Sequence, residues 1–279
     1  MTQALDALTA QLLDAAKAAG ADTADAMAVR GTSLSVEVRG GKLEEAQREE
    51  GTDIGLRVFV GQRSAIVSSS DASSRTLSEM ATRAVAMARE APENTYAGLA
   101  DPDQIATDWD VASLELSDPT PEPAPAALQE DAAQAEAAAL EVEGISQVQS
   151  ASAAYGARDI HMAGTNGFSG GYRRTDRGLS CVAIAGTGTG MERDYDGDSR
   201  IFQSDLRGAA EIGRTAAERT LLRLGARKPR TGSFPVLFDE RIASSLIGHL
   251  LGAVNGSSIA RGASFLRDAM GAQVLPKGM

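Results

Sequence analysis

The chain has 279 residues, a length that allows about two domains and a sizeable core. Its residues are 43% hydrophobic and 23% charged, as in ordinary soluble proteins, and its net charge of −11 disfavours direct binding to nucleic acid. Cys181 is the single cysteine, so an internal disulfide is excluded. The chain shows neither a signal-peptide pattern nor an apolar run long enough to span a membrane. We therefore expect a cytoplasmic protein.

The N-terminal part is expected to form an α+β domain over residues 1–110. Leu5, Leu8 and Leu12 repeat with helical spacing, whereas Leu34, Val36 and Val38 alternate with polar residues, as in a half-buried strand. In chain order we expect a helix over 3–19, strands over 26–30 and 34–38, a hairpin over 54–68 and a helix ending near 90. This order predicts helices that cover one face of a sheet.

The segment 111–125 is expected to be a linker, because prolines recur between 119 and 125 and stiffen the chain. A second α+β domain is expected over 126–229. Its predicted elements are a helix over 126–142, strands over 147–158 and 179–185, and a helix over 204–224. A strand over 234–238 and a helix over 240–254 follow.

Seven short segments, in this order along the chain, carry a family resemblance. They are 33–44, 55–61, 165–174, 191–195, 235–238, 246–249 and 262–266. Together they resemble the TldD/PmbA metalloprotease family. The resemblance implies an N-terminal domain, a middle domain and a mostly β C-terminal domain, of which residues 230–279 would be an incomplete beginning. The fold class expected is thus α+β, with two helix-covered mixed or antiparallel sheet domains followed by the start of a truncated C-terminal domain. Family-motif positions expected to have structural roles are Gly55, Arg57, Asn166, Gly167, Arg193, Gly248, Ser264 and Phe265.

The zinc motif of the family is degenerate in this chain. TldD-type members carry His-Glu-x-x-x-His, in which the histidines bind zinc and the glutamate acts as general base on the bound water. Here the matching positions hold Ser244, Ser245 and His249. A serine hydroxyl is a poor zinc ligand and cannot replace a carboxylate base. The chain therefore resembles the PmbA (TldE)-type branch, and we expect no catalytic residue, metal or other cofactor of its own.

The resemblance implies a non-catalytic subunit of a metalloprotease. A TldD-type partner would supply zinc, and the substrates would be peptides or small unfolded proteins, such as a microcin precursor or an antitoxin. An older family name is modulator of DNA gyrase. The alternative is a stand-alone peptide- or protein-binding modulator without proteolysis. Neither nucleic acid nor membrane is an expected partner, and a homodimer is left open.

Five other features have structural interpretations. We interpret Asp194–Asp198 as a turn rather than a calcium loop, because the glycine and distal glutamate of such loops are missing. Cys181 is expected in the core. His249 is expected to be packed or hydrogen-bonded between Leu246, Leu250 and Leu251 rather than to be a remnant ligand. The basic stretch 214–230 is interpreted as a solvated helix face. Residues 234–266 are expected to be poorly covered, because their apolar side chains lack strands to pack under.

Overall fold

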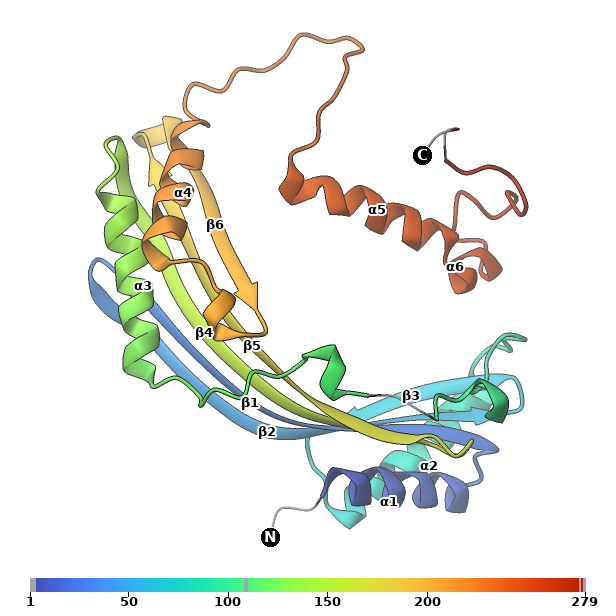
Figure 1. The fold of residues 1–279 in the computed structure, drawn as a ribbon. Helices are drawn as coiled ribbons and strands as arrows, with labels where there is room; N and C mark the ends of the chain where they lie inside the picture. The colour runs from blue at the N-terminus through green and yellow to red at the C-terminus, as the bar shows by residue number, and fades with distance from the viewer. Residues whose placement is uncertain (1–3, 108–109, 276, 278–279) are drawn as a thin grey trace. The chain divides into compact units, whose positions relative to one another are not determined.

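The fold is α+β, as expected, and is organised around one sheet. The computed structural model describes residues 4–107, 110–275 and 277, and the chain divides into two compact units, Met1–Ala226 and Arg227–Met279. Six antiparallel strands form the sheet of the first unit in the order β3-β2-β1-β4-β5-β6 (Figure 1). Within the described residues, no helix has the length and apolar character that crossing a bilayer would require.

The two expected sheets are halves of this continuous sheet. The strands are β1 (Thr23–Arg39), β2 (Lys42–Val60), β3 (Arg63–Ser69), β4 (Ile145–Gly164), β5 (Ser169–Ala185) and β6 (Glu192–Arg200). The long strand β1 joins the halves, because Ala26 lies opposite Leu56 of β2 on one side and Ala163 of β4 on the other. The two short strands expected over 26–30 and 34–38 are parts of β1, since pairing continues through residues 31–33.

Helices pack against both halves of the sheet. The helices beside the sheet are α1 (Leu5–Ala19), α2 (Ser74–Glu90), α3 (Pro125–Leu140) and α4 (Ala209–Leu221), whereas α5 (Glu240–Val254) and α6 (Gly256–Ala260) belong to the second unit. Short 3-10 turns are η1 (Pro102–Gln104), η2 (Ala112–Leu114), η3 (Gly188–Gly190) and η4 (Gln203–Asp205). Helix α1 ends where Gly20 adopts the left-handed conformation at φ 94°, and α2 begins where the Ser73 hydroxyl accepts a hydrogen bond from the Thr76 N–H.

Two hydrophobic cores lie on the same face of the sheet. Alternate side chains of β1 enter both: Ala24, Ala26 and Ala28 pack with α1 and α2, whereas Leu34, Val36 and Val38 pack with α3 and α4. All six positions are even-numbered, and alternation along a strand places them on one face. Figure 1 shows α1 and α2 beside one end of the strands and α3 and α4 beside the other. The opposite face carries the odd-numbered side chains of β1.

The proline-rich segment is tied to the sheet through Asp118. The Asp118 N–H donates to the Thr175 hydroxyl at 2.8 Å. The Asp118 carboxylate accepts from the backbone N–H groups of Gln203 at 2.7 Å and Thr120 at 2.8 Å. These bonds lower the pKa of Asp118, the bond from Gln203 most strongly, followed by those from Thr120.

Two sequence interpretations are wrong in their secondary structure. Residues 194–198 form part of β6 rather than a turn, because Tyr195 and Gly197 pair with Val182 and Ser180 of β5. Residues 234–238 form no strand, since no described segment pairs with their backbone, and Leu237 is 97% exposed.

Candidate functional site

The positions of the degenerate zinc motif lie on α5 in the second unit. Asp239 caps this helix by accepting a hydrogen bond from the Arg241 N–H at 3.0 Å. Ser245 and His249 are four residues apart and share a helix side, whereas Ser244 precedes His249 by five residues and faces partly away. All three residues are exposed. The helix thus presents one imidazole beside serine hydroxyls.

Ser245 and the chain's other histidine each have a partner within their own unit. The Ser245 hydroxyl donates to the backbone carbonyl of Ile242 at 2.6 Å, so it is already used in a bond to its own helix. Among the described residues, no three His, Cys, Asp or Glu side chains are grouped so that they could hold a metal ion. The other histidine, His161, belongs to the first unit, where its Nδ1 lies 2.9 Å from the Thr9 hydroxyl.

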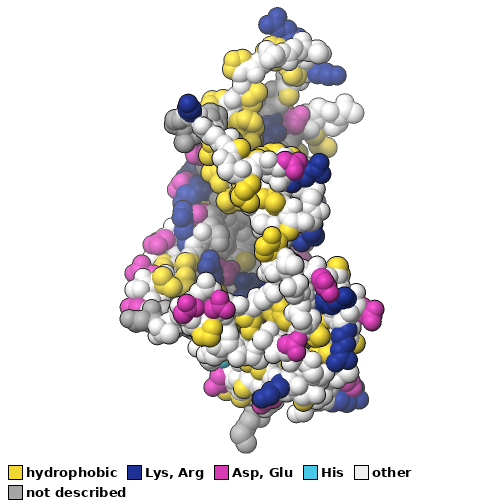
Figure 2. All heavy atoms as spheres, turned by 90° about the vertical axis from the view of Figure 1, so that its right-hand side faces the viewer, with side chains coloured by type: hydrophobic (Ala, Val, Ile, Leu, Met, Phe, Trp, Pro, Cys, Tyr) yellow, Lys and Arg dark blue, Asp and Glu magenta, His cyan; other side chains and the backbone are white. Residues whose placement is uncertain are grey.

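The expected packing of His249 among leucines is not found. His249 is exposed, and Leu246 and Leu251 are themselves 44% and 62% exposed. The only residue of α5 that is buried is Ala253. Figure 2 shows hydrophobic side chains that reach the surface on the face in view. The second unit therefore offers an apolar helix face around its degenerate motif.

Two family-motif positions of the first unit come together at one cavity. On β2, Arg57 donates to both carboxylate oxygens of Asp25, with Nε 3.1 Å from each. In the turn between β4 and β5, the Asn166 side chain donates to the Ala100 carbonyl at 3.0 Å. Both residues line a cavity of about 350 Å³. Gly167 supplies the left-handed turn conformation beside Asn166, at φ 95°.

The remaining family-motif positions have separate surroundings. Gly55 lies on β2, and Arg193 on β6 donates to the Gln149 side chain at 2.9 Å. Gly248 lies on α5 with open space where a Cβ would stand. Ser264 is buried and donates to the Ala253 carbonyl at 2.6 Å, whereas Phe265 is exposed. Ser264 therefore closes the end of the second unit's helices, a structural role.

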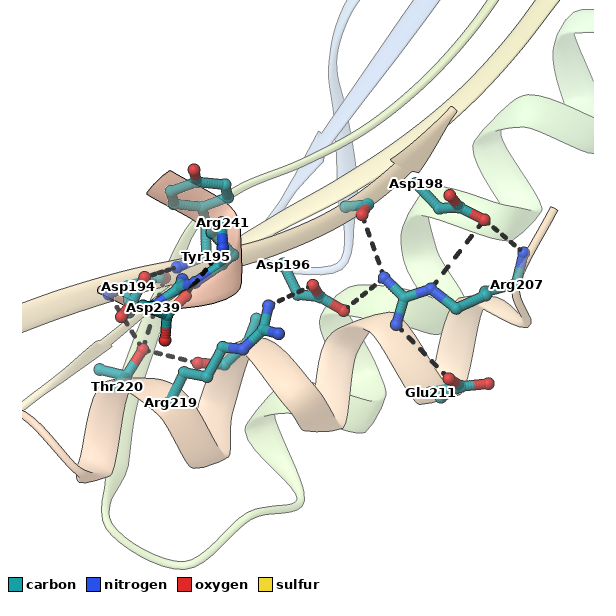
Figure 3. A network of polar contacts seen from close by, with 12 residues as sticks. Asp194, Tyr195, Asp196, Asp198, Arg207, Glu211, Arg219, Thr220, Asp239 and Arg241 are labelled. Atoms are coloured by element: carbon teal, nitrogen blue, oxygen red, sulfur yellow. Dashed lines mark hydrogen bonds and ion pairs between the residues drawn. The ribbon is translucent and has the colours of Figure 1, made fainter. Parts of the chain in front are cut away.

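A ladder of buried ion pairs, missed in the sequence, joins β6 to α4 and the residues beside it. Asp194, Asp196 and Asp198 point to the helix-covered face of β6 and are largely buried (Figure 3). Asp196 binds both Arg207, at 2.8 Å, and Arg219. The Arg223 Nε lies 2.7 Å from Asp194, and the Arg207 backbone N–H donates to Asp198 at 3.1 Å. Two features of the sequence could have predicted these ion pairs: the alternation of the three aspartates, which places them on one face of a strand, and the helical spacing of Arg219 and Arg223.

This ladder changes the interpretation of the basic stretch 214–230. Arg219 and Arg223 are not simply solvated, because their guanidinium groups neutralise carboxylates that the sheet buries. The arginines also occupy carboxylate oxygens that a calcium ion would need. Asp194–Asp198 is therefore a structural element that ties the edge strand β6 to α4 and the residues beside it.

Comparison with protein-family models gives three matches along the chain. Residues 24–88 match PmbA/TldA metallopeptidase domain 1, residues 116–224 match the central domain of that family, and residues 231–279 match its C-terminal domain.

Curated relatives agree with these matches. The chain is 34% identical over 258 residues to Metalloprotease PmbA of Escherichia coli O157:H7, covering 91% of this chain and 56% of the relative. It is 31% identical over 267 residues to the Metalloprotease PmbA homolog of Haemophilus influenzae, covering 95% and 58%. The chain spans little more than half the length of these relatives.

Solved structures share the fold. A proposed modulator of DNA gyrase from Bacteroides thetaiotaomicron superimposes with a TM-score of 0.82 at 24% identity, over 94% of this chain and 60% of that one. TldE from Thermococcus kodakarensis superimposes with a TM-score of 0.69 at 15% identity, over 94% and 58%. At these identities the likeness concerns the fold alone.

Proposed function

The chain belongs to the PmbA/TldD metallopeptidase family, and from that membership we propose that it is a PmbA/TldE-type, non-catalytic subunit of a peptide-degrading assembly. In this proposal it binds peptides or small unfolded proteins in the cytoplasm, of the microcin-precursor or antitoxin kind, and a TldD-type partner cleaves them. Zinc is held by the partner.

The observation that carries the proposal is the pair Ser244 and Ser245 on α5. A zinc hydrolase needs about three protein ligands, an open position for water and a base that takes the proton of that water. Ser244 stands where the family motif has a histidine ligand, and Ser245 stands where it has the glutamate base. His249 alone supplies one ligand and no general base beside it.

The exposed apolar face of α5 supports association with another protein. Five large side chains of this helix are at least 44% exposed: Ile242, Leu246, Ile247, Leu251 and Val254. Contiguous apolar patches of this kind on soluble proteins commonly mark interaction surfaces. A partner that covers this face would remove apolar area from water and gain binding free energy in proportion to it.

A direct action on DNA has little support despite the name that one structural relative carries. With a net charge of −11, the chain has to overcome electrostatic repulsion from a phosphate backbone. An indirect effect through degradation of a regulatory peptide agrees with this charge. The proposal therefore assigns the chain to peptide handling.

Co-expression with the TldD-type protein of the same organism tests this assignment. We expect a complex on size-exclusion chromatography with light scattering, zinc-dependent digestion of casein or peptides by the complex, and none by this chain alone. Leu251→Glu on α5 should weaken the complex, whereas Ser244→Ala on the same helix should not. Proteolysis by this chain alone would contradict the proposal. Peptide binding without any association would favour a stand-alone modulator instead.

A further inference from the structure

A cavity in the first unit lies on the sheet face opposite the helices. Its volume is about 350 Å³, and the segment 98–106 forms one wall. Asp25 of β1 and Arg57 of β2 line it, and they alternate with the core residues Ala24 and Leu56. The cavity thus occupies the uncovered face of the sheet, where a ligand reaches it without opening either core.

The walls of the cavity are largely apolar. Leu99 and Ile105 come from the covering segment, and Met162 and Phe168 come from the ends of β4 and the turn after it. Met162 is 40% exposed although it is a large hydrophobic side chain. Asn166 fixes the covering segment, because its amide donates to the Ala100 carbonyl at 3.0 Å and accepts from the Phe168 N–H at 3.3 Å. These two hydrogen bonds position the wall of the cavity before any ligand binds.

Two polar side chains of the cavity lining, those of Arg57 and Gln104, carry hydrogen-bond donors. Arg57 binds Asp25 through Nε and Nη2, and its guanidinium lies 5.2 Å from the centre of the Phe59 ring. Within the described part of the chain, its Nη1 has no recorded partner. Gln104 accepts from the Asp101 N–H through Oε1 at 3.2 Å, and its Nε2 likewise has no recorded partner among those residues. Both side chains belong to the cavity lining, so their N–H groups are the donors that it offers to a ligand.

We infer that this cavity binds a small carboxylate that carries an apolar group, of about the size of an N-acylated amino acid. The apolar group would lie against Leu99, Ile105 and Met162, and the carboxylate would accept from Arg57 and Gln104. A guanidinium binds a carboxylate more strongly than it binds a neutral carbonyl, because the bond is charge-assisted. A volume of about 350 Å³ lies at the lower end of ligand pockets and suits one residue rather than a long peptide.

This chemistry has two sources: a free N-acyl amino acid, or the last residue of a peptide with an apolar side chain. The inference stands on the cavity alone and does not rest on the proposed function. A chain that never meets a protease partner would still bind the carboxylate. The two sources differ in what precedes the apolar residue, and this difference can be tested with short ligands.

Methyl NMR on the chain labelled at its methionine methyl groups measures the binding directly. The Met162 signal, assigned by its loss in Met162→Leu, should shift saturably with N-acetyl-L-leucine, with a Kd on the order of 1 mM. Met87 on α2, which is exposed and does not line the cavity, is the internal control. If the natural ligand is the end of a peptide, a Gly-Gly-Leu peptide with a free carboxylate should bind at least as well as N-acetyl-L-leucine. If the natural ligand is a free N-acyl amino acid, this peptide should bind more weakly than N-acetyl-L-leucine.

Variants separate the cavity from general surface binding. Gln104→Ala should weaken binding about fivefold to tenfold by removing one charge-assisted bond. Ala106→Trp should abolish binding by filling the cavity, whereas Thr107→Trp, beside it on the same segment but outside the lining, should not. N-acetyl-leucinamide should bind at least tenfold more weakly. Equal binding of the amide would overturn the carboxylate assignment, and no saturable shift of Met162 with any ligand would overturn the site.

Discussion

The carboxylate of Glu136 accepts a hydrogen bond from the backbone N–H of Gly40 at 2.6 Å. The next N–H, that of Gly41, donates to the same carboxylate at 2.8 Å. Gly40 and Gly41 have φ values of 60° and 70°, so both lie in the left-handed region that a tight hairpin turn requires. Two successive N–H groups in such a turn form a concave anion site. Helix α3 thereby fixes the turn between β1 and β2.

Replacing Glu136 by alanine should therefore destabilise the first unit by about 2 kcal/mol, because the two backbone N–H groups of the turn lose their charged acceptor. Glu136 is only 3% exposed. Urea unfolding followed by circular dichroism measures the loss. Glu130→Ala on the exposed side of the same helix is the matched control and should change the free energy of unfolding by less than about 0.5 kcal/mol. Equal effects of the two variants would contradict the role of the turn.

Asp196→Ala should cost about 3 kcal/mol, because it leaves Arg207 and Arg219 without the buried carboxylate that binds both. The partly exposed arginines regain some hydration, so the loss should not exceed this value. The comparison is Glu79→Ala, which removes an exposed i,i+4 pair with Arg75 and should cost at most about 0.5 kcal/mol. Thermal and urea unfolding of both variants measure the difference. A loss for Asp196→Ala no larger than that for Glu79→Ala would show that the ladder is not stabilising.

The Asp118 carboxylate should make stability depend on pH in the acid range. The pKa of Asp118 is lowered in the folded chain, most strongly by the bond from the Gln203 N–H. The ionised carboxylate therefore stabilises the fold fully at pH values above the unfolded pKa near 4. This stabilisation is lost as the pH falls through the folded pKa. Asp118→Asn should thus reduce stability more at about pH 7 than at about pH 3. Urea unfolding across this pH range is the measurement. Asp103→Asn on the exposed η1 is the matched control and should change the free energy of unfolding at about pH 7 by less than about 0.5 kcal/mol. A pH-independent deficit for Asp118→Asn would disprove the linkage.

Cys181 should be inert in the folded chain. Burial raises its pKa to about 12, with a smaller contribution from the charges of Glu136 and Asp196. The thiolate, which is the nucleophile, is then scarce at about pH 8, and the side chain is inaccessible. Mass spectrometry after iodoacetamide treatment should show almost no alkylation without denaturant and complete alkylation in urea. Rapid alkylation of the native chain would show that the core between the sheet and helices α3 and α4, which contains Cys181, opens readily.

The isolated chain should hold no stoichiometric zinc, and Ser244→His with Ser245→Glu should not turn it into a protease. The double variant restores a ligand and a base, but a zinc site also needs a third ligand and outer contacts that orient the first shell. Metal analysis after dialysis and a chelator-controlled casein assay measure both statements. One tightly held zinc per unmodified chain, lost in His249→Ala, would contradict the expected absence of zinc. Chelator-sensitive cleavage by the double variant alone would contradict the expectation that it is not a protease.

Helices and buried strands could be predicted from sequence because their apolar spacing is regular. The helix expected over 240–254 matches α5, and the helix ending near 90 matches α2. The first part of β2, residues 42–53, was not predicted, because its glutamates and Arg48 face solvent on an edge without apolar alternation. Charged side chains on an open edge discourage pairing with other chains. They also remove the apolar alternation by which a strand is predicted from sequence.

The site was only partly predictable, because side-chain partners come from distant segments. The sequence shows Ser244, Ser245 and His249 at motif spacing, and the family comparison confirms the surrounding domain. It does not show that Arg57 and Asn166 line one cavity, since β2 and the turn after β4 meet only when the sheet forms. The aspartates of β6 were likewise misread, because their arginine partners follow in a helix and in the segment before it.

The shared strand β1 has a consequence for how the chain folds. Thr9 and His161, which meet across α1 and β4, are separated by 152 positions in the sequence. Pairing of β1 with β4 has to await synthesis of the middle of the chain, and closure of so long a loop carries an entropic cost before any contact offsets it. On the ribosome, the residues up to β3 therefore emerge with one side of β1 unpaired. A nascent chain at that stage exposes a long backbone edge, so we expect slow folding and a need for protection from aggregation until β4 arrives.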